Sequence, residues 1–456
     1  MQKTIQNGGA NKSHSLSFML RIALSAVAIL CFAAFFVFGP MEMLSQRNDA
    51  DGFYIFIACV LSLASVAFFL FKKENIKSDI VFASFLAVTA AAVAMRLFLF
   101  DAISNDYVQF LSRWLTEMRG LSGVEPITTP IGDYNMPYLY FLFGVSKNGL
   151  YDLYQIKVLS VIFDIVLALG VMKLVSVFKK GEITLLAAYT AALFIPTVFL
   201  NSAYWGQCDG IYTAFSVWAL YFALSERPKT SVVFFALAFS FKIQTIFILP
   251  IIIFLIARHK IKMTDLLLFP VTFILTLVPA IICGRGLYDT FSIYIDQTAS
   301  YPNLTLNCPT FWALFPDEQF DIFGDAALFL AGAVCLFFMA YLFTNREKLN
   351  SALLFDAAFI FTLLLPFFLP RMHERYFYLA EVMSVIYVLI HKNRFYIPPL
   401  IIFTSFCCYC PYLFGYRLLN LEILTFINIA IILYILKTFS QDISNIKTIS
   451  DAKEEE

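Results

Sequence analysis

The chain has 456 residues, of which 60% are apolar and 14% are charged, and Phe alone accounts for 52 of them. Soluble domains carry roughly 25% charged residues, so this composition excludes an ordinary soluble domain and indicates a polytopic membrane protein. The 32 basic and 32 acidic side chains give a formal net charge of zero, so no positive excess indicates a nucleic-acid partner.

The chain begins with polar residues and then alternates between apolar runs and short polar segments. Residues 1–17 are too rich in Asn and Ser to pack, and we expect a cytoplasmic tail there. The run at 18–39 is long enough to cross a bilayer, and no small-residue cleavage site follows it, so it predicts a retained first span. Further apolar runs cover residues 53–71 and 80–100.

Lys and Arg recur in clusters between these runs, and such clusters are retained on the cytoplasmic side. All of them fall on one side if about fourteen segments cross the membrane. This predicts an all-α bundle in a single membrane domain at 18–437, with a catalytic outer loop at 101–156. An acidic cytoplasmic tail follows at 438–456.

That count requires a break between residues 230 and 257. A continuous helix of this length would measure about 42 Å at about 1.5 Å per residue, against a hydrocarbon layer of about 30 Å. It would also leave its two basic ends on opposite sides. We therefore predict two short antiparallel segments that turn near Lys242.

Ten ionisable residues outside the basic clusters come out at or near the outer leaflet in this topology. Charges at membrane depth are costly unless they are paired or solvated, so such a group marks a substrate path or a water-filled cavity. Its members are Arg96, Asp101, Asp106, Asp133, Asp209, Lys242, Arg285, His373, Glu374 and Arg375. The nine cysteines fall mostly in apolar runs without metal-ligand spacing, so we predict no metal site among them.

Five short motifs in the outer segments carry a resemblance. They are Asn105-Asp106-Tyr107 with Trp114, Gly132-Asp133-Tyr134-Asn135-Met136-Pro137-Tyr138, Trp205-Gly206-Gln207-Cys208-Asp209, Phe241-Lys242-Ile243-Gln244, and Met372-His373-Glu374-Arg375-Tyr376. In this order they resemble the GT-C superfamily of membrane glycosyltransferases. Similar members are the bacterial GPI-mannosyltransferase-like proteins and, more distantly, the glucosyltransferases that extend the dolichol-linked N-glycan precursor. The D-x-D pair of some GPI mannosyltransferases is absent, which leaves the sugar and the acceptor open.

The resemblance implies a GT-C-type bundle with extracytoplasmic loop helices in the plasma (inner) membrane. It implies an inverting transfer of a hexose, mannose or glucose, from a polyprenyl-phosphate donor. The acceptor would be a hydroxyl on a lipid-linked glycan, a polymer or a protein. Such a transfer requires a carboxylate base near that hydroxyl, and the resemblance assigns the role to Asp106, with Asp133 as the rival. No cofactor is expected, and a divalent cation held by these two carboxylates is the open alternative.

The departing phosphate gains negative charge, so cations beside it lower the barrier. We assign this role to His373, Arg375 and Lys242. Further expected substrate contacts are Arg96, Trp205, Gln207, Asp209, Tyr134 and Glu374, where Trp205 would stack on a sugar and Arg96 would pair with Asp106 or orient it. Structural alternatives are a loop-end salt bridge around Glu374, an interfacial Trp belt, and a Lys242 that reaches the interface.

A competing functional class is also polytopic with polar outer loops. It comprises lipid-linked glycan polymerases or ligases, and transporters or flippases of glycolipids. Transporters often show related halves with interrupted helices at matching positions, whereas this sequence shows one predicted break and no internal repeat. These features favour a transferase.

Overall fold

The computed structural model describes residues 19–25, five residues between 62 and 69, and residues 76–299 and 301–446. Almost all of the regular structure in these ranges is helical, as the composition predicts. The predicted tail at 1–17 and most of the first two apolar runs lie outside the described residues.

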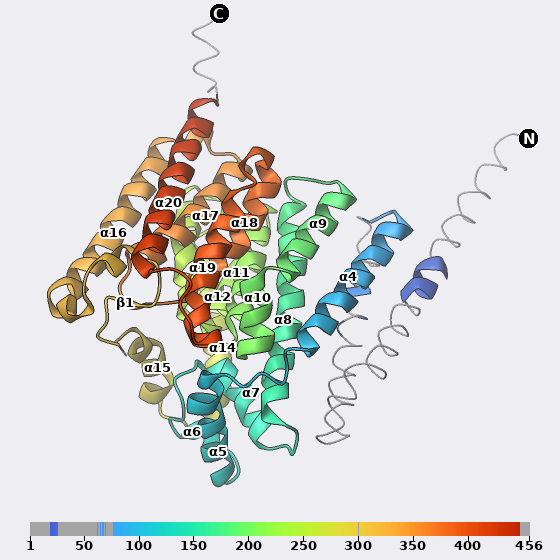
Figure 1. Ribbon diagram of the computed structural model, residues 1–456, viewed down its shortest axis with the longest axis vertical. Coiled ribbons are helices and arrows are strands. Elements are labelled where there is room, and N and C mark those ends of the chain that lie inside the picture. Colours follow the sequence, from blue (N-terminus) through green and yellow to red (C-terminus); the bar gives the residue numbers. More distant parts are fainter. Residues whose placement is uncertain are drawn as a thin grey trace, which may run out of the picture.

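The helices stand side by side in a bundle, and α5, α6, α7 and α15 gather at one end of it, away from the C-terminus (Figure 1). The larger helices of the bundle are α4 (Asp79–Leu97), α8 (Asp152–Val175), α9 (Glu182–Leu193), α11 (Asp209–Leu224), α12 (Pro228–Phe241), α13 (Leu249–Ala257), α14 (Leu268–Ile282), α16 (Phe320–Thr344), α17 (Ser351–Phe368), α18 (Tyr378–Ile390), α19 (Ile397–Phe414) and α20 (Leu421–Ser444).

The remaining elements are short or lie at the end of the bundle. They are α5 (Ser112–Gly120), α6 (Glu125–Thr128), α7 (Met136–Ser146), α10 (Pro196–Phe199), α15 (Leu287–Ala299), β1 (Thr305–Leu306) and β2 (Met372–His373). Two π-helical turns cover Tyr107–Leu111 and Leu200–Trp205. Single 3₁₀ turns cover Ile243–Ile248, Asp265–Leu267, Phe311–Leu314, Asp317–Gln319, Arg346–Lys348 and Lys392–Arg394.

Seven helical stretches of the described chain are long and apolar enough to cross a membrane. An eighth crossing is possible if the pair Glu182–Leu193 and Pro196–Trp205, bent by 50°, forms one span. The predicted count of about fourteen is not confirmed, because expected segments such as α12 and α18 have only 14 and 13 residues. A straight span needs about 20. Helix α20 continues to Ser444, beyond the expected domain boundary at residue 437.

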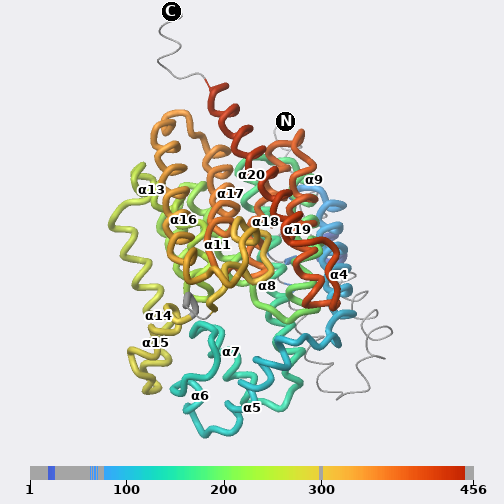
Figure 2. The backbone as a smooth tube through the Cα atoms, turned by 60° about the vertical axis from the view of Figure 1, so that its left-hand side comes forward, coloured from blue at the N-terminus to red at the C-terminus, as the bar shows by residue number. Residues whose placement is uncertain are grey.

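The predicted break at Lys242 is confirmed. Helix α12 ends at Phe241, Lys242 has an extended backbone with φ −156° and ψ 133°, and a 3₁₀ turn begins at Ile243. Figure 2 shows α13 beyond this break, at the side of the bundle next to α16. The break places the Lys242 side chain beside the first turn of α11.

Helices α8 and α17 form the centre of the bundle. In these two, 72% and 78% of the apolar stretch is buried, against 17% and 22% in the stretches that contain α14 and α16. A helix that is apolar on all sides and buried needs neighbours on every face, whereas exposed apolar side chains such as Phe329 and Phe337 on α16 suit a lipid surface. The central position of α8 makes it a rigid support for the segments that pack on its end.

A short parallel pairing links two distant loops. Thr305 of β1 lies opposite Met372 of β2, and Leu306 lies opposite His373. Backbone pairing of this kind fixes the direction of side chains along the strand. It holds His373 beside the segment that follows α15.

Candidate active site

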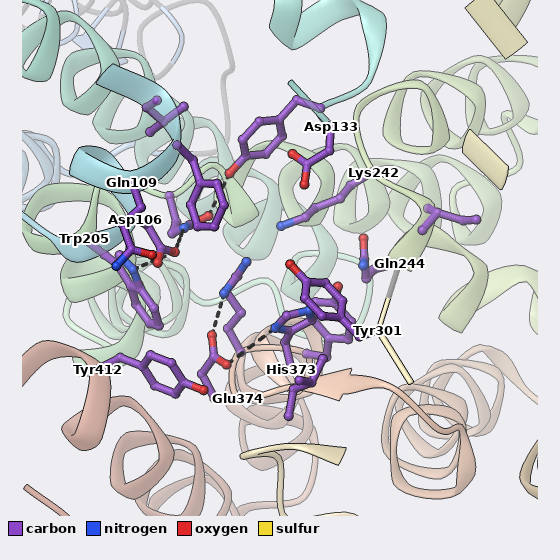
Figure 3. A pocket seen from close by; sticks show the side chains of 18 of the residues that line it. Asp106, Gln109, Asp133, Trp205, Lys242, Gln244, Tyr301, His373, Glu374 and Tyr412 are labelled. Carbon is purple, nitrogen blue, oxygen red and sulfur yellow. Dashed lines mark hydrogen bonds and ion pairs between the residues drawn. The ribbon is translucent and has the colours of Figure 1, made fainter. Parts of the chain in front are cut away.

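One cavity of about 340 Å³ brings together residues from distant parts of the chain (Figure 3). Nine of the eleven site residues predicted from the sequence line it: Asp106, Asp133, Tyr134, Trp205, Gln207, Lys242, His373, Glu374 and Arg375. The other two, Arg96 and Asp209, lie elsewhere. The cavity lies between the loops that precede α5 and α7 and the ends of α11, α12 and α19.

Asp106 is held by neutral hydrogen-bond donors. Its Oδ2 accepts hydrogen bonds from Gln207 Nε2 at 2.6 Å and from Trp205 Nε1 at 3.1 Å. Its Oδ1 has no hydrogen-bond partner among the residues that the structure describes. Tyr134 donates to Gln207 Oε1 at 3.0 Å, which turns the amide nitrogen toward Asp106. One oxygen of Asp106 is therefore fixed, and the other can accept a proton.

A glycine allows both donors to reach that carboxylate. Gly206 lies between Trp205 and Gln207 and has φ +79°, a left-handed conformation that costs Gly little and other residues more. The Gln207 backbone N–H closes this turn onto the Asn201 carbonyl at 2.9 Å. The turn follows a π-helical segment, a feature common at functional sites.

The Trp205 ring is packed inside the protein. It is 2% exposed, it stacks on Tyr412 at 5.9 Å between ring centroids, and Tyr409 meets its edge at 5.1 Å. The prediction of an interfacial belt is therefore wrong, whereas stacking on a sugar stays a prediction, because Trp205 lines the cavity. Burial leaves its N–H directed at Asp106, and the role that the contacts support is to position the carboxylate.

Two cations share one buried carboxylate behind the cavity wall. Asp209 is 1% exposed, and its Oδ1 contacts Lys242 Nζ. Its Oδ2 lies 3.3 Å from Arg375 Nε and accepts a hydrogen bond from Asn201 Nδ2 at 2.9 Å. Asp209 does not line the cavity, so the prediction that it contacts substrate is wrong. It anchors the two cations, because a buried charge requires a partner of opposite sign.

Arg375 also pairs with its neighbour. Its Nη1 donates to Glu374 Oε1. Burial lowers the pKa of Arg375, but Glu374 and Asp209 outweigh it and hold that pKa well above its usual value. Burial alone would raise the pKa of Glu374. The Arg375 and His373 charges outweigh burial, so the pKa of Glu374 lies below its usual value. Both groups stay ionised near neutral pH.

His373 lies beside this pair. Its Nδ1 is 3.7 Å from Glu374 Oε2, and its ring meets Tyr301 edge-on at 5.3 Å between centroids. Tyr301 follows α15, so the strand pairing of Leu306 with His373 also brings this tyrosine into the cavity.

Asp133 lies on the cavity wall near the cations. Burial raises its pKa above the usual value, and the Arg375, Lys242 and His373 charges offset only part of that effect. A raised pKa makes an ionised carboxylate a stronger base, so this shift does not decide between the two carboxylates.

Arg96 lies outside the cavity, and the prediction that it pairs with Asp106 is wrong. Its Nε is 2.8 Å from Asp164 Oδ2, and both side chains are buried. Its Nη2 donates to the Leu193 carbonyl at 2.8 Å. The last turn of α4 faces α8 instead of the loop, so the pair ties these helices together.

The cavity also contains residues that the sequence did not single out for a role. They are Gln109, Gln244, Tyr376 and Tyr412, together with Trp114 of the first motif. Gln109 is three residues after Asp106, so helical spacing could have indicated it. Tyr412 comes at the end of the apolar stretch of α19, where no local pattern distinguishes it from a core aromatic.

Among the described residues, no group of three metal ligands lies at the cavity. Within the described ranges, the one group of three ligands close enough for a metal ion is Asp356, His391 and Asp442, within 4.8 Å of one another. These residues lie on α17, after α18 and near the end of α20, and Arg394 Nη2 already donates to Asp442 Oδ2 at 2.7 Å. No such group of three ligands among the described residues includes Asp106 or Asp133.

Comparison with models of known protein families finds no match, and a search of curated proteins finds none either. The fold and the cavity define an all-α membrane protein with charged side chains gathered in one hollow. Any proposal about the reaction therefore rests on the motifs and on the geometry of the site.

Proposed function

We propose that this protein is an inverting, GT-C-type glycosyltransferase. It moves a hexose, mannose or glucose, from a polyprenyl-phosphate donor to an acceptor hydroxyl in cell-surface or lipid-linked glycan assembly. The observation that carries the proposal is the arrangement in Figure 3, where Asp106 lies on one side of the cavity and Lys242 and His373 lie on the other. A base and a set of phosphate-binding cations are the two parts that such a transfer needs.

The reaction is a displacement at the anomeric carbon. The acceptor oxygen forms a bond to that carbon, and its proton passes to the open Oδ1 of Asp106. The bond between the anomeric carbon and the phosphate oxygen breaks, and its electron pair stays on the phosphate. Attack from the side opposite the leaving group inverts the configuration. Lys242, Arg375 and His373 stabilise the added charge on the phosphate.

The charges on the wall suit a donor with one phosphate. Asp209 and Glu374 offset much of the charge of Lys242 and Arg375, which are paired with them. The formal charges of these four groups therefore sum to zero, and this wall carries a positive charge only when His373 is protonated. A phosphodiester brings a single negative charge, whereas a diphosphate brings at least two and usually requires a metal ion beside it.

The surroundings of the cavity suit a lipid-borne substrate. The bundle presents long apolar helices, so a polyprenyl chain can remain in the bilayer while its phosphate enters the cavity. The basic clusters predict that this end faces the extracytoplasmic side of the plasma membrane. The loop helices α5, α6 and α7 would then form the outer part of the GT-C-type fold.

The test is to incubate purified full-length protein with short-chain polyprenyl-phosphate hexoses and acceptor extracts. Release of polyprenyl phosphate that depends on Asp106 supports the proposal, and the Asp106→Asn variant is the matched control. No release from any donor in the panel would contradict it. Movement of an intact labelled donor across a vesicle bilayer, without cleavage, would instead support the transporter class.

A further inference from the structure

One face of α8 contacts both chain segments that build the Asp106 site. Tyr154, Lys157 and Ser160 follow one another at intervals of three residues, so their side chains lie on one side of the helix. Tyr154 donates through its hydroxyl to the Asp101 carboxylate. Ser160 Oγ donates to the Gln207 carbonyl at 2.7 Å. We call residues 98–106 the base loop and residues 201–207 the Gln207 loop.

Lys157 is the central residue of this face. Its Nζ donates to the carbonyls of Leu99 at 3.0 Å, Phe100 at 2.8 Å and Ala102 at 2.7 Å. The side chain is 0% exposed, so its three N–H groups are used inside the protein. These carbonyls follow the last turn of α4, where helical partners end and a positive charge is favourable.

The same lysine also contacts the Gln207 loop. A Cβ built on Gly206 would lie 3.9 Å from Lys157 Cγ and 4.0 Å from its Cε, so the aliphatic part of the lysine packs on this turn. Ser104 of the base loop donates to the Trp205 carbonyl at 2.7 Å, which joins the two loops directly. The ammonium therefore holds one loop while its stem supports the other.

We propose that Lys157 is a positioning residue for the proposed base, an inference that rests on the proposed function. It does not line the cavity. It sets where Asp106 stands relative to the N–H donors of Trp205 and Gln207 and relative to a bound acceptor. Without the ammonium, three carbonyls, of which that of Phe100 is buried, lose a donor, and the base loop shifts away from the support that α8 gives it.

The test compares two identical substitutions on the same helix. Lys157→Met keeps an unbranched stem but removes the N–H donors, and Lys173→Met is the matched control. Lys173 is also buried and lies over the Phe69 ring, sixteen residues further along α8, or about 24 Å away. Both variants are measured as full-length protein in detergent for kcat and for calorimetric affinity toward a non-transferable phosphonate analogue of the donor.

We expect Lys157→Met to lower kcat by about 10- to 100-fold, because a shift of about 1 Å in a catalytic group has this effect. Its affinity for the analogue should stay within about twofold, since the cations on the other wall are untouched. Hydrogen exchange should quicken in the base loop, residues 98–106. Lys173→Met should leave kcat and exchange in the base loop unchanged.

A second variant covers the case in which Lys157→Met does not fold. Ser104→Ala removes only the hydroxyl that joins the loops, and it should lower kcat with unchanged analogue affinity. Wild-type kcat in a folded Lys157→Met protein, or an equal loss in both Lys→Met variants, would overturn the proposal. If the wild-type protein cleaves no donor, the proposed function fails. The positioning role is tested independently of activity, because unchanged hydrogen exchange in the base loop of Lys157→Met would overturn it.

Discussion

Two regions of the molecule bring acids and bases together from distant helices, and they do so in different ways. Near the ends of α18 and α20, each acid faces a basic side chain: His391 Nε2 lies 2.9 Å from Asp356 Oδ2, and Arg394 Nη2 lies 2.7 Å from Asp442 Oδ2. In the cavity, Asp106 is instead held by the neutral side chains of Trp205 and Gln207.

The difference separates structural from chemical use of a carboxylate. An acid that a cation already neutralises stabilises the fold, and its proton affinity is reduced by the partner. An acid held at one oxygen by neutral donors has an open oxygen that can accept a proton from a reacting hydroxyl. The same distinction applies inside the site. Asp209 pairs with two cations, whereas no cation among the described residues pairs with Asp106.

The sharpest test of this comparison is the loss of a carboxylate at each region. Asp106→Asn should lower kcat by at least about 10²- to 10⁴-fold, because an amide keeps the shape but cannot accept the proton. Donor affinity should be unchanged. Asp442→Asn, the matched control, should retain transfer. Near-normal turnover of Asp106→Asn together with an inactive Asp133→Asn would exchange the roles of the two carboxylates.

The next largest effect should be on stability when one cation is removed from each network. Arg375→Met leaves Asp209 and Glu374 buried with less compensation, and breaking such a buried pair costs about 3 to 5 kcal/mol. Arg394→Met leaves Asp442 with 28% of its side chain exposed, so its cost should be about 1 kcal/mol or less. Thermal unfolding midpoints in detergent measure both. Equal decreases in the unfolding midpoints of the two variants would contradict the expected effect of burial.

Substitutions of the other two cations should weaken donor binding as well as transfer. Lys242→Ala and His373→Ala each remove a charge-assisted contact, worth about 1.5 to 3 kcal/mol, or about 10- to 150-fold in affinity. Calorimetry with the phosphonate analogue measures this, and Lys260→Ala, an exposed lysine in a basic cluster, is the control. Unchanged affinity in both variants would leave the phosphate without a site on this wall.

The smallest expected effect is a pH dependence of stability due to Asp133. Burial raises its folded-state pKa above the unfolded value of about 3.9, so the folded protein binds more protons between these two values. The contribution of Asp133 to stability is therefore present at low pH and lost as pH rises through the folded pKa. The unfolding midpoint of Asp133→Asn, minus that of wild type, should rise with pH across this window. A constant difference would contradict the raised pKa.

Much of the site could be predicted from sequence because charges are rare in an apolar chain. A charge that must avoid lipid gathers with others around water or a substrate, so Asp106, Lys242 and His373 could be expected near one another before any coordinates. The break at Lys242 followed from length and charge, since one helix over residues 230–257 would exceed the bilayer thickness and leave its two basic ends on opposite sides. The roles of Trp205 and Arg96 could not be obtained in this way.

The sequence by itself determined an all-α membrane protein and nine of the eleven expected cavity residues, because composition and motif order do not depend on how helices rotate. The tertiary structure decided which charges pair. In the structure Arg96 pairs with Asp164, Asp209 anchors two cations, and Tyr412 packs against Trp205. Such pairings depend on the rotation and the ends of neighbouring helices, and packing across the whole bundle sets both.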